Sequence, residues 1–238
     1  MRNLKAFNRT VVICLFFCVM ADALIGQRPV EVFTPSDFNR AAYEHYGHFK
    51  KIPEQIKPQV LTALSYYPEL RPIKIKFRIK RRRIPLTSRP RILSIFRKKK
   101  NRNYLITISS KSSLGLSPIL LSNLPYNAQI GVLGHELAHI SHYNTKNTFQ
   151  LLGIAFGMLN SRQVDRFEWN TDRLTIAHGL GYQLLDWSVY VRKALRIEGW
   201  HGASNKNAIE LEPSENERYM NPETILSFIG KDGQYVKD

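Results

Sequence analysis

Residues 131–144 read GVLGHELAHISHYN and contain three of the seven histidines of the chain, with a glutamate directly after the first. We expect a helix over residues 125–143, with Ser122 or Asn123 as its cap. At about 100° per residue, four aliphatic side chains then fall within about an 80° arc, which is typical of a core-facing stripe. These side chains are Ile130, Leu133, Leu137 and Ile140. The histidines lie on roughly the opposite side, so the helix is expected to have two different faces.

The histidine face has the spacing of a metal site. His135 and His139 are one helical turn apart, so that two imidazole nitrogens can bind one ion, and Glu136 can reach a water molecule at that ion. This is the HExxH motif of zinc hydrolases. Catalytic zinc sites have three protein ligands and an open position, so the motif requires a third ligand from elsewhere in the chain.

Two residues are candidates for the third ligand. The metzincin extension, which would place a histidine at position 145, is absent because the chain has Thr145 there. His142 lies on the same face as the motif, but one straight helix is poorly suited to place three such side chains around a tetrahedral ion. Glu168 can approach from a separate helix, and Asp172, four residues later, would then accept the remaining N–H of a ligand histidine. The alternative is that Glu168 and Asp172 only pair with nearby arginines.

The rest of the pattern predicts an α+β fold. Helices are expected over residues 35–52, 57–70, 148–159, 161–181, 181–195 and 221–229, and strands over 73–80, 91–96 and 103–110. Residues 73–80 read IKIKFRIK, whose alternation predicts a strand with one core face and one cationic face. We therefore expect an α+β domain, with a small, mainly antiparallel sheet packed on the HExxH helix.

The N-terminus resembles a secretory signal. A basic start, an apolar run over 11–20 and the small-x-small triplet ADA at 21–23 have this form, and the run is too short to favour a spanning helix. Both cysteines lie in the run, so a cleaved product would contain no disulfide. We expect export to the periplasm or medium, with an uncleaved membrane anchor as the alternative.

The predicted organisation has four parts: a signal segment (1–23), an N-terminal helical segment (24–70), a catalytic core (71–199) and a polar C-terminal tail with a short helix (200–238).

The charge distribution is strongly uneven. The chain has a net charge of +16, residues 71–102 contain fifteen Lys and Arg, and residues 71–135 contain no carboxylate. A cationic sheet face attracts polyanions, so the segment Arg71–Arg102 predicts contact with an anionic membrane surface or an envelope glycolipid. Aromatic side chains suited to base stacking are sparse there, which argues against specific nucleic-acid binding. The alternative is a merely solvated face.

The order of a strand at 103–110, an HExxH helix and a later E-x-x-x-D helix resembles gluzincin-type zinc metallopeptidases. It is similar to the family containing the CAAX prenyl protease and the heat-shock membrane protease, and to its small one-domain relatives; the likeness covers about residues 103–195. The resemblance implies a zincin-like fold, with His135, His139 and Glu168 as zinc ligands, Glu136 as general base and Asp172 as the acid that holds a ligand histidine. It also implies that strand 103–110 is the edge to which an extended substrate adds.

The chain departs from this family in two respects. After its start it has no long apolar helices, so cleavage inside a membrane is not implied. The side chain that would polarise the scissile carbonyl also cannot be placed from spacing. His178, Tyr143, Tyr182 and His201 are the candidates.

These observations favour a zinc-dependent peptidase that binds one zinc ion per chain and acts on a protein or peptide. Two other functions stay open. One is a zincin-like scaffold that binds metal without cleaving, and the other is a cationic envelope-binding protein in which HELAH is incidental.

Overall fold

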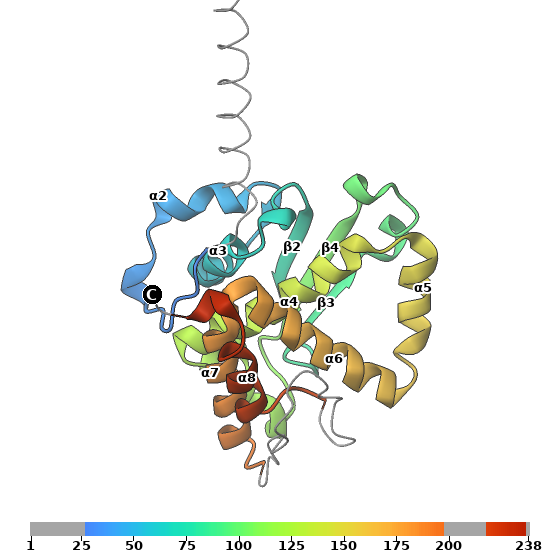
Figure 1. Cartoon of the computed structure of the whole chain (residues 1–238). Helices are drawn as coiled ribbons and strands as arrows, with labels where there is room; N and C mark the ends of the chain where they lie inside the picture. The colour runs from blue at the N-terminus through green and yellow to red at the C-terminus, as the bar shows by residue number, and fades with distance from the viewer. Residues whose placement is uncertain (1–26, 198–217, 237–238) are drawn as a thin grey trace, which may run out of the picture.

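A computed structural model describes residues 27–197 and 218–236 of the chain (Figure 1). The predicted signal segment 1–23 and His201 lie outside the described residues. The described part combines several helices with one small sheet, as expected for the α+β class. No helix within it is both long and apolar enough to cross a membrane.

The sheet is mixed, with four strands in the order β1-β2-β4-β3. The strands are β1 (Lys50–Lys51), β2 (Lys74–Ile79), β3 (Leu86–Pro90) and β4 (Asn103–Ile108). β2 is parallel to both β1 and β4, and β3 is antiparallel to β4. The expectation of a mainly antiparallel sheet is therefore wrong.

The path of the chain between β2 and β3 explains this topology. Lys80 N donates to Ile108 O and Ser109 N donates to Pro85 O, so residues 80–85 pass over the end of β4. β3 then returns along the outer side of β4, which leaves β4 in the middle of the sheet. Five of the six β4 residues are buried, as is typical of a central strand. Strand 103–110 is therefore not an edge strand; the edge next to it is β3.

The strand expected over residues 91–96 is wrong. Pairing with β4 continues only as far as Arg91, whose N–H donates to Asn103 O. Ser94 Oγ then accepts from Asn103 N and donates to Arg91 O, which closes a 3₁₀ turn over Ile92–Ser94. The apolar side chains of this turn are exposed, because no described element covers them.

The helix expected over residues 35–52 is broken into short pieces around α2 (Arg40–Tyr43). The Asn39 side chain accepts from the N–H groups of Ala41 and Ala42, so a new helix starts there. Phe49, with a φ of 60°, ends the helical region before β1. The next helix, α3, is shorter than expected (Lys57–Ser65), because a proline starts the 3₁₀ turn Pro68–Leu70.

The remaining helices lie close to their expected positions. They are α4 (Tyr126–Thr145), α5 (Thr148–Gly157), α6 (Ser161–Thr175), α7 (Gly181–Ala194) and α8 (Pro222–Ile229), with a π-helical segment at Ile176–Leu180 between α6 and α7. Short 3₁₀ turns cover Pro35–Asp37, Glu44–Gly47, Glu54–Ile56, Lys99–Asn101, Leu114–Ile119, Leu121–Asn123 and Gly233–Tyr235. Neither Ser122 nor Asn123 caps α4, since that helix begins directly after Pro125.

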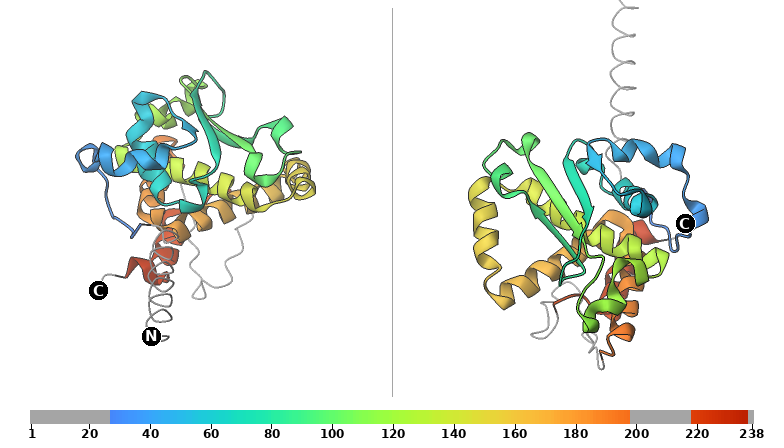
Figure 2. Two further views of the ribbon diagram at one scale, coloured as in Figure 1. Left: turned by 90° about the horizontal axis from the view of Figure 1, so that it is seen from above. Right: turned by 180° about the vertical axis from the view of Figure 1, so that it is seen from behind.

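Helix α4 is the centre of the molecule, between the sheet on one side and α6 and α7 on the other (Figure 2). Fifteen of its twenty residues are buried. The predicted aliphatic stripe is fully buried, and His135, Glu136 and His139 on the other face are buried as well. Both faces of α4 are therefore internal, and its polar groups need partners inside the protein.

The C-terminal segment 218–236 is packed against the rest of the protein. Met220 and Ile225 are fully buried and form a second apolar cluster with residues of α6 and α7, among them Trp169 and Leu184. Residues 218–236 therefore pack on the helix that carries Glu168.

Helices α4 and α7 approach each other closely at Gly131. A Cβ atom there would lie 2.1 Å from the carbonyl oxygen of Gln183, a backbone atom that cannot move aside. Glycine therefore sets the distance between the two helices at this crossing.

Gly131→Ala should lower the free energy of unfolding by about 2 kcal/mol or more, because α4 and α7 must separate. Gly153→Ala is the matched control: it lies inside α5 with nothing near its Cβ position, and it should raise stability by up to about 1 kcal/mol. Urea unfolding of both variants measures the difference. Equal effects of the two substitutions would contradict the close-approach argument.

Candidate metal centre

Helices α4 and α6 bring three metal-binding side chains together. His135 and His139 project from α4 and Glu168 projects from α6, whose start is capped by the Asn160 side chain. Glu168 Oε2 lies 3.1 Å from Nε2 of each histidine. The ligand atoms of the three residues all lie within 4.8 Å of one another. This group of two imidazoles and one carboxylate could hold a metal ion.

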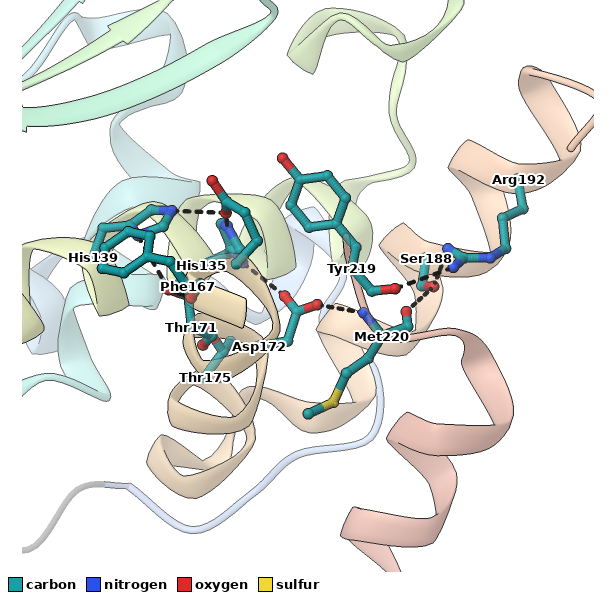
Figure 3. Close-up of polar contacts among 12 residues, drawn as sticks. His135, His139, Phe167, Thr171, Asp172, Thr175, Ser188, Arg192, Tyr219 and Met220 are labelled. Atoms are coloured by element: carbon teal, nitrogen blue, oxygen red, sulfur yellow. Dashed lines mark hydrogen bonds and ion pairs between the residues drawn. The ribbon is translucent and has the colours of Figure 1, made fainter. Parts of the chain in front are cut away.

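The other nitrogen of each histidine is held by a hydrogen bond to α6 (Figure 3). His135 Nδ1–H donates to Asp172 Oδ1 at 2.7 Å. His139 Nδ1 lies 3.1 Å from Thr171 Oγ1, which donates its own hydrogen to Phe167 O. Because a hydroxyl has only one hydrogen, Thr171 Oγ1 accepts from His139 Nδ1–H. Both rings therefore carry their proton on Nδ1 and direct the metal-binding Nε2 toward Glu168.

Without a metal ion, this site retains an additional proton on His135. Burial acts to lower the pKa of His135, but hydrogen bonds to Asp172 and Glu168 outweigh burial and raise the pKa to about 10. At Glu168 burial is likewise outweighed by the contacts to both histidines, which hold its pKa well below the usual range. A metal ion at Nε2 must displace the proton on His135. Metal binding at neutral pH therefore releases a proton, and affinity falls as the pH falls.

Glu136 is the buried carboxylate beside this group. It is only 6% exposed, and its Oε2 atom makes no hydrogen bond to any described residue. Burial raises the pKa of Glu136 against the opposing charges of His139 and His135. A buried polar oxygen without a partner is costly, so a water molecule or substrate group that bonds to it would be favoured there. Glu136 is available to a molecule that enters the site.

A segment far away in the sequence completes the surroundings of His135. Met220 N donates to the second oxygen of Asp172 at 2.8 Å, which fixes the carboxylate that holds His135. The rings of Tyr219 and Trp187 pack against the His135 ring at centroid distances of 5.7 and 5.6 Å. Figure 3 shows Tyr219 and Met220 on the side of Asp172 away from Thr171. These contacts limit the movement of the ring.

Sequence reasoning missed Thr171, Tyr219 and Met220. Thr171 could have been found, because it lies three residues after Glu168 and therefore faces the same side of α6. No spacing rule points to Tyr219 or Met220, since their relation to α6 depends on how the chain returns after α7.

The other candidate residues lie outside the metal-binding group. His142 is half-buried against Phe167, and burial lowers its pKa. His178 lies in the π-helical segment, where it contacts Leu174 O and Glu69 Oε1 and stacks on Tyr67. Its position could not be judged from a straight helix, because Gly179 has a φ of 90°.

The two tyrosine candidates have different neighbours. Tyr143 stacks on the His139 and Phe167 rings, and Tyr182 packs against Tyr235. None of the described candidates for the carbonyl-polarising role belongs to the group that could hold a metal ion.

Comparison of the chain with protein-family models, curated proteins and solved structures found no match. The assignment of the site therefore rests on the geometry of its own residues.

Thr171→Val should reduce the affinity for added zinc by about 10- to 100-fold, because it removes the acceptor that orients His139 while keeping the side-chain volume. Thr175→Val is the matched control: Thr175 lies one turn further along α6, is also buried, and its hydroxyl donates to Thr171 O. Competition with a fluorescent zinc chelator measures both affinities. Equal affinities in the two variants would overturn the proposed orientation of His139.

Proposed function

We propose that this chain is a zinc-dependent peptidase of the gluzincin type. The observation that carries the proposal is a buried carboxylate, Glu136, whose Oε2 atom has no hydrogen-bond partner among the described residues and which lies close enough to His135 and His139 to interact with their charges. A site built only to hold metal needs the three ligands but has no use for this fourth group. The pairing of HExxH with a glutamate on a later helix, as in gluzincins, supports the same reading.

Zinc suits this donor set best. Two imidazole nitrogens and one carboxylate oxygen are common ligands of catalytic zinc, and calcium or magnesium would favour more oxygen atoms. Ligand atoms around a tetrahedral zinc ion at about 2.0–2.1 Å are about 3.3 Å apart, close to the 3.1 Å between Glu168 Oε2 and each histidine Nε2. These two separations fit a zinc ion, and the three ligand atoms as a set lie within 4.8 Å of one another.

The proposed mechanism is hydrolysis of a peptide bond by water. Zinc, when bound, supplies a Lewis acid that acidifies water and polarises a carbonyl group. Glu136 accepts the proton of the attacking water as the new C–O bond forms. As the C–N bond breaks, Glu136 passes that proton to the leaving amine. Its raised pKa suits both steps, because a carboxyl group with a pKa nearer neutrality both takes and returns a proton readily.

The substrate would bind along β3 rather than along the strand that the family likeness implied. β3 is an edge strand with one side unpaired in the sheet, and it packs against α4, which carries Glu136. Ser88 of β3 is near enough to Glu136 to counter part of the rise in its pKa. An extended peptide that pairs with β3 would therefore pass beside the metal-binding group. Export of the enzyme is proposed from residues 1–23 alone.

Glu136→Gln should retain zinc but lose about 10²- to 10⁴-fold in hydrolysis, because the amide keeps the shape of the side chain and cannot accept the proton. Zinc content and cleavage of an unfolded protein such as casein are measured on the same samples. Glu54→Gln, at an exposed glutamate, is the control and should match the wild type.

Three other results would contradict the proposal in different ways. Unchanged cleavage by a zinc-loaded Glu136→Gln variant excludes Glu136 as the base. Loss of zinc together with activity would mean that Glu136 helps to bind the metal. A zinc-loaded wild-type chain that cleaves no substrate would favour the non-cleaving scaffold.

A further inference from the structure

Helix α5 has an apolar surface that nothing in the described structure covers. Its sequence TFQLLGIAFG contains no charged residue, yet only Leu151 is buried. Phe149 and Phe156, seven residues apart, lie on one side of the helix and are 84% and 72% exposed, and Leu159 just beyond α5 is also exposed. An apolar helix normally packs its surface against another element or a partner.

A second exposed apolar group lies next to the first. Ile92, Leu93 and Phe96, in the connection between β3 and β4, are between 67% and 82% exposed. Hydrogen bonds join this connection to the start of α5, and both views in Figure 2 show the two side by side. The bonds run from Thr148 Oγ1 to Ile95 O, from Arg102 to Lys146 O and from Lys99 to Thr145 O.

We call these exposed residues the apolar patch: Ile92, Leu93, Phe96, Phe149, Phe156 and Leu159.

Positive charge borders the apolar patch at β3 and the connection that follows it. Six exposed bases lie on β3 and the following connection: Arg89, Arg91, Arg97, Lys98, Lys99 and Lys100. The only carboxylate between residues 71 and 164 is Glu136, which is buried in the metal centre. No acidic side chain from these elements therefore neutralises the bases. The surface combines exposed rings with an uncompensated cationic border.

We propose that the apolar patch docks this protein on a lipid bilayer that contains anionic phospholipids. Aromatic and aliphatic side chains enter the boundary between headgroups and acyl chains, and the surrounding bases contact the lipid phosphates. A second copy of the chain suits this surface less well, because pairing two such patches would bring their cationic borders together. An apolar pocket on another protein would satisfy the rings but leave the bases without partners.

Docking through the apolar patch would hold the metal centre close to the membrane without a spanning helix. Along α4, His139 lies about 9 Å from Thr145, the residue whose carbonyl oxygen accepts a hydrogen bond from Lys99. Substrates at the membrane surface would therefore be near the metal-binding residues. The inference goes beyond the proposed peptidase activity and holds whether or not the chain binds zinc.

The test is sedimentation of the full chain with vesicles of phosphatidylcholine alone or with roughly one third phosphatidylglycerol. We expect binding to the anionic vesicles only, weakened by salt. The triple variant Leu93→Ser, Phe96→Ser, Phe149→Ser should bind at least about tenfold more weakly, although it keeps every charge. The triple variant Arg97→Gln, Lys98→Gln, Lys100→Gln should lose a similar factor while keeping the apolar patch.

Matched variants keep the test specific. Val32→Ser, Leu226→Ser, Val236→Ser removes three exposed apolar side chains outside the apolar patch, and Lys51→Gln, Lys193→Gln, Lys231→Gln removes three exposed bases elsewhere. Both should bind like the wild type. All variants retain the apolar run at residues 11–20, so differences between them report on the substituted surface. Thermal unfolding confirms that each is folded, because serine or glutamine at an exposed position should change stability little.

Several results would overturn the inference. They are equal binding by the apolar-patch variants and their controls, equal binding to neutral and anionic vesicles, and no vesicle binding by the wild type. A wild-type dimer that does not bind vesicles, and that the apolar-patch variants convert to a monomer, would assign the surface to self-association instead.

Discussion

The structure depends on burying both faces of α4. One face is aliphatic and packs without further requirements. The other carries imidazole and carboxylate groups, which are costly to bury unless each finds a hydrogen-bond partner or a metal. Helix α6 supplies most of the partners: Asp172 for His135, Thr171 for His139, and Glu168 between the two Nε2 atoms. The need to give these buried polar groups of α4 hydrogen-bond partners accounts for the position of α6 against α4.

The C-terminal segment belongs to the same arrangement. Asp172 can hold His135 firmly only if its second oxygen is also bonded, and Met220 N provides that bond. Met220 is itself held by Ser188 Oγ, which donates to Met220 O, and its side chain is buried in the cluster that includes α8. A chain of contacts therefore leads from the C-terminal helix to a metal-binding histidine. Glu136 is the exception, since its Oε2 atom is buried without a partner in the described structure.

Local patterns predicted several elements correctly but not their arrangement, and they failed at residues 35–52 and 91–96. The alternation of residues 73–80 and the β-branched run at 103–110 placed β2 and β4 correctly, because side-chain periodicity reports directly on burial. It does not report which strands are neighbours, so the mixed order and the central place of β4 were not foreseen. At the site, the spacing of His135 with His139 and of Glu168 with Asp172 was enough to place these side chains on common helix faces. Tyr219 and Met220 could not be found, because no sequence rule gives the return path of the chain after α7.

The central claim is that His135, His139 and Glu168 together bind zinc. The most direct test is elemental analysis of the purified full chain after reconstitution with zinc at neutral pH, beside a His135→Ala/His139→Ala double variant shown to be folded. The account predicts about one zinc ion per chain in the wild type and none in the double variant. No zinc in the wild type, or the same zinc content in both proteins, would contradict it.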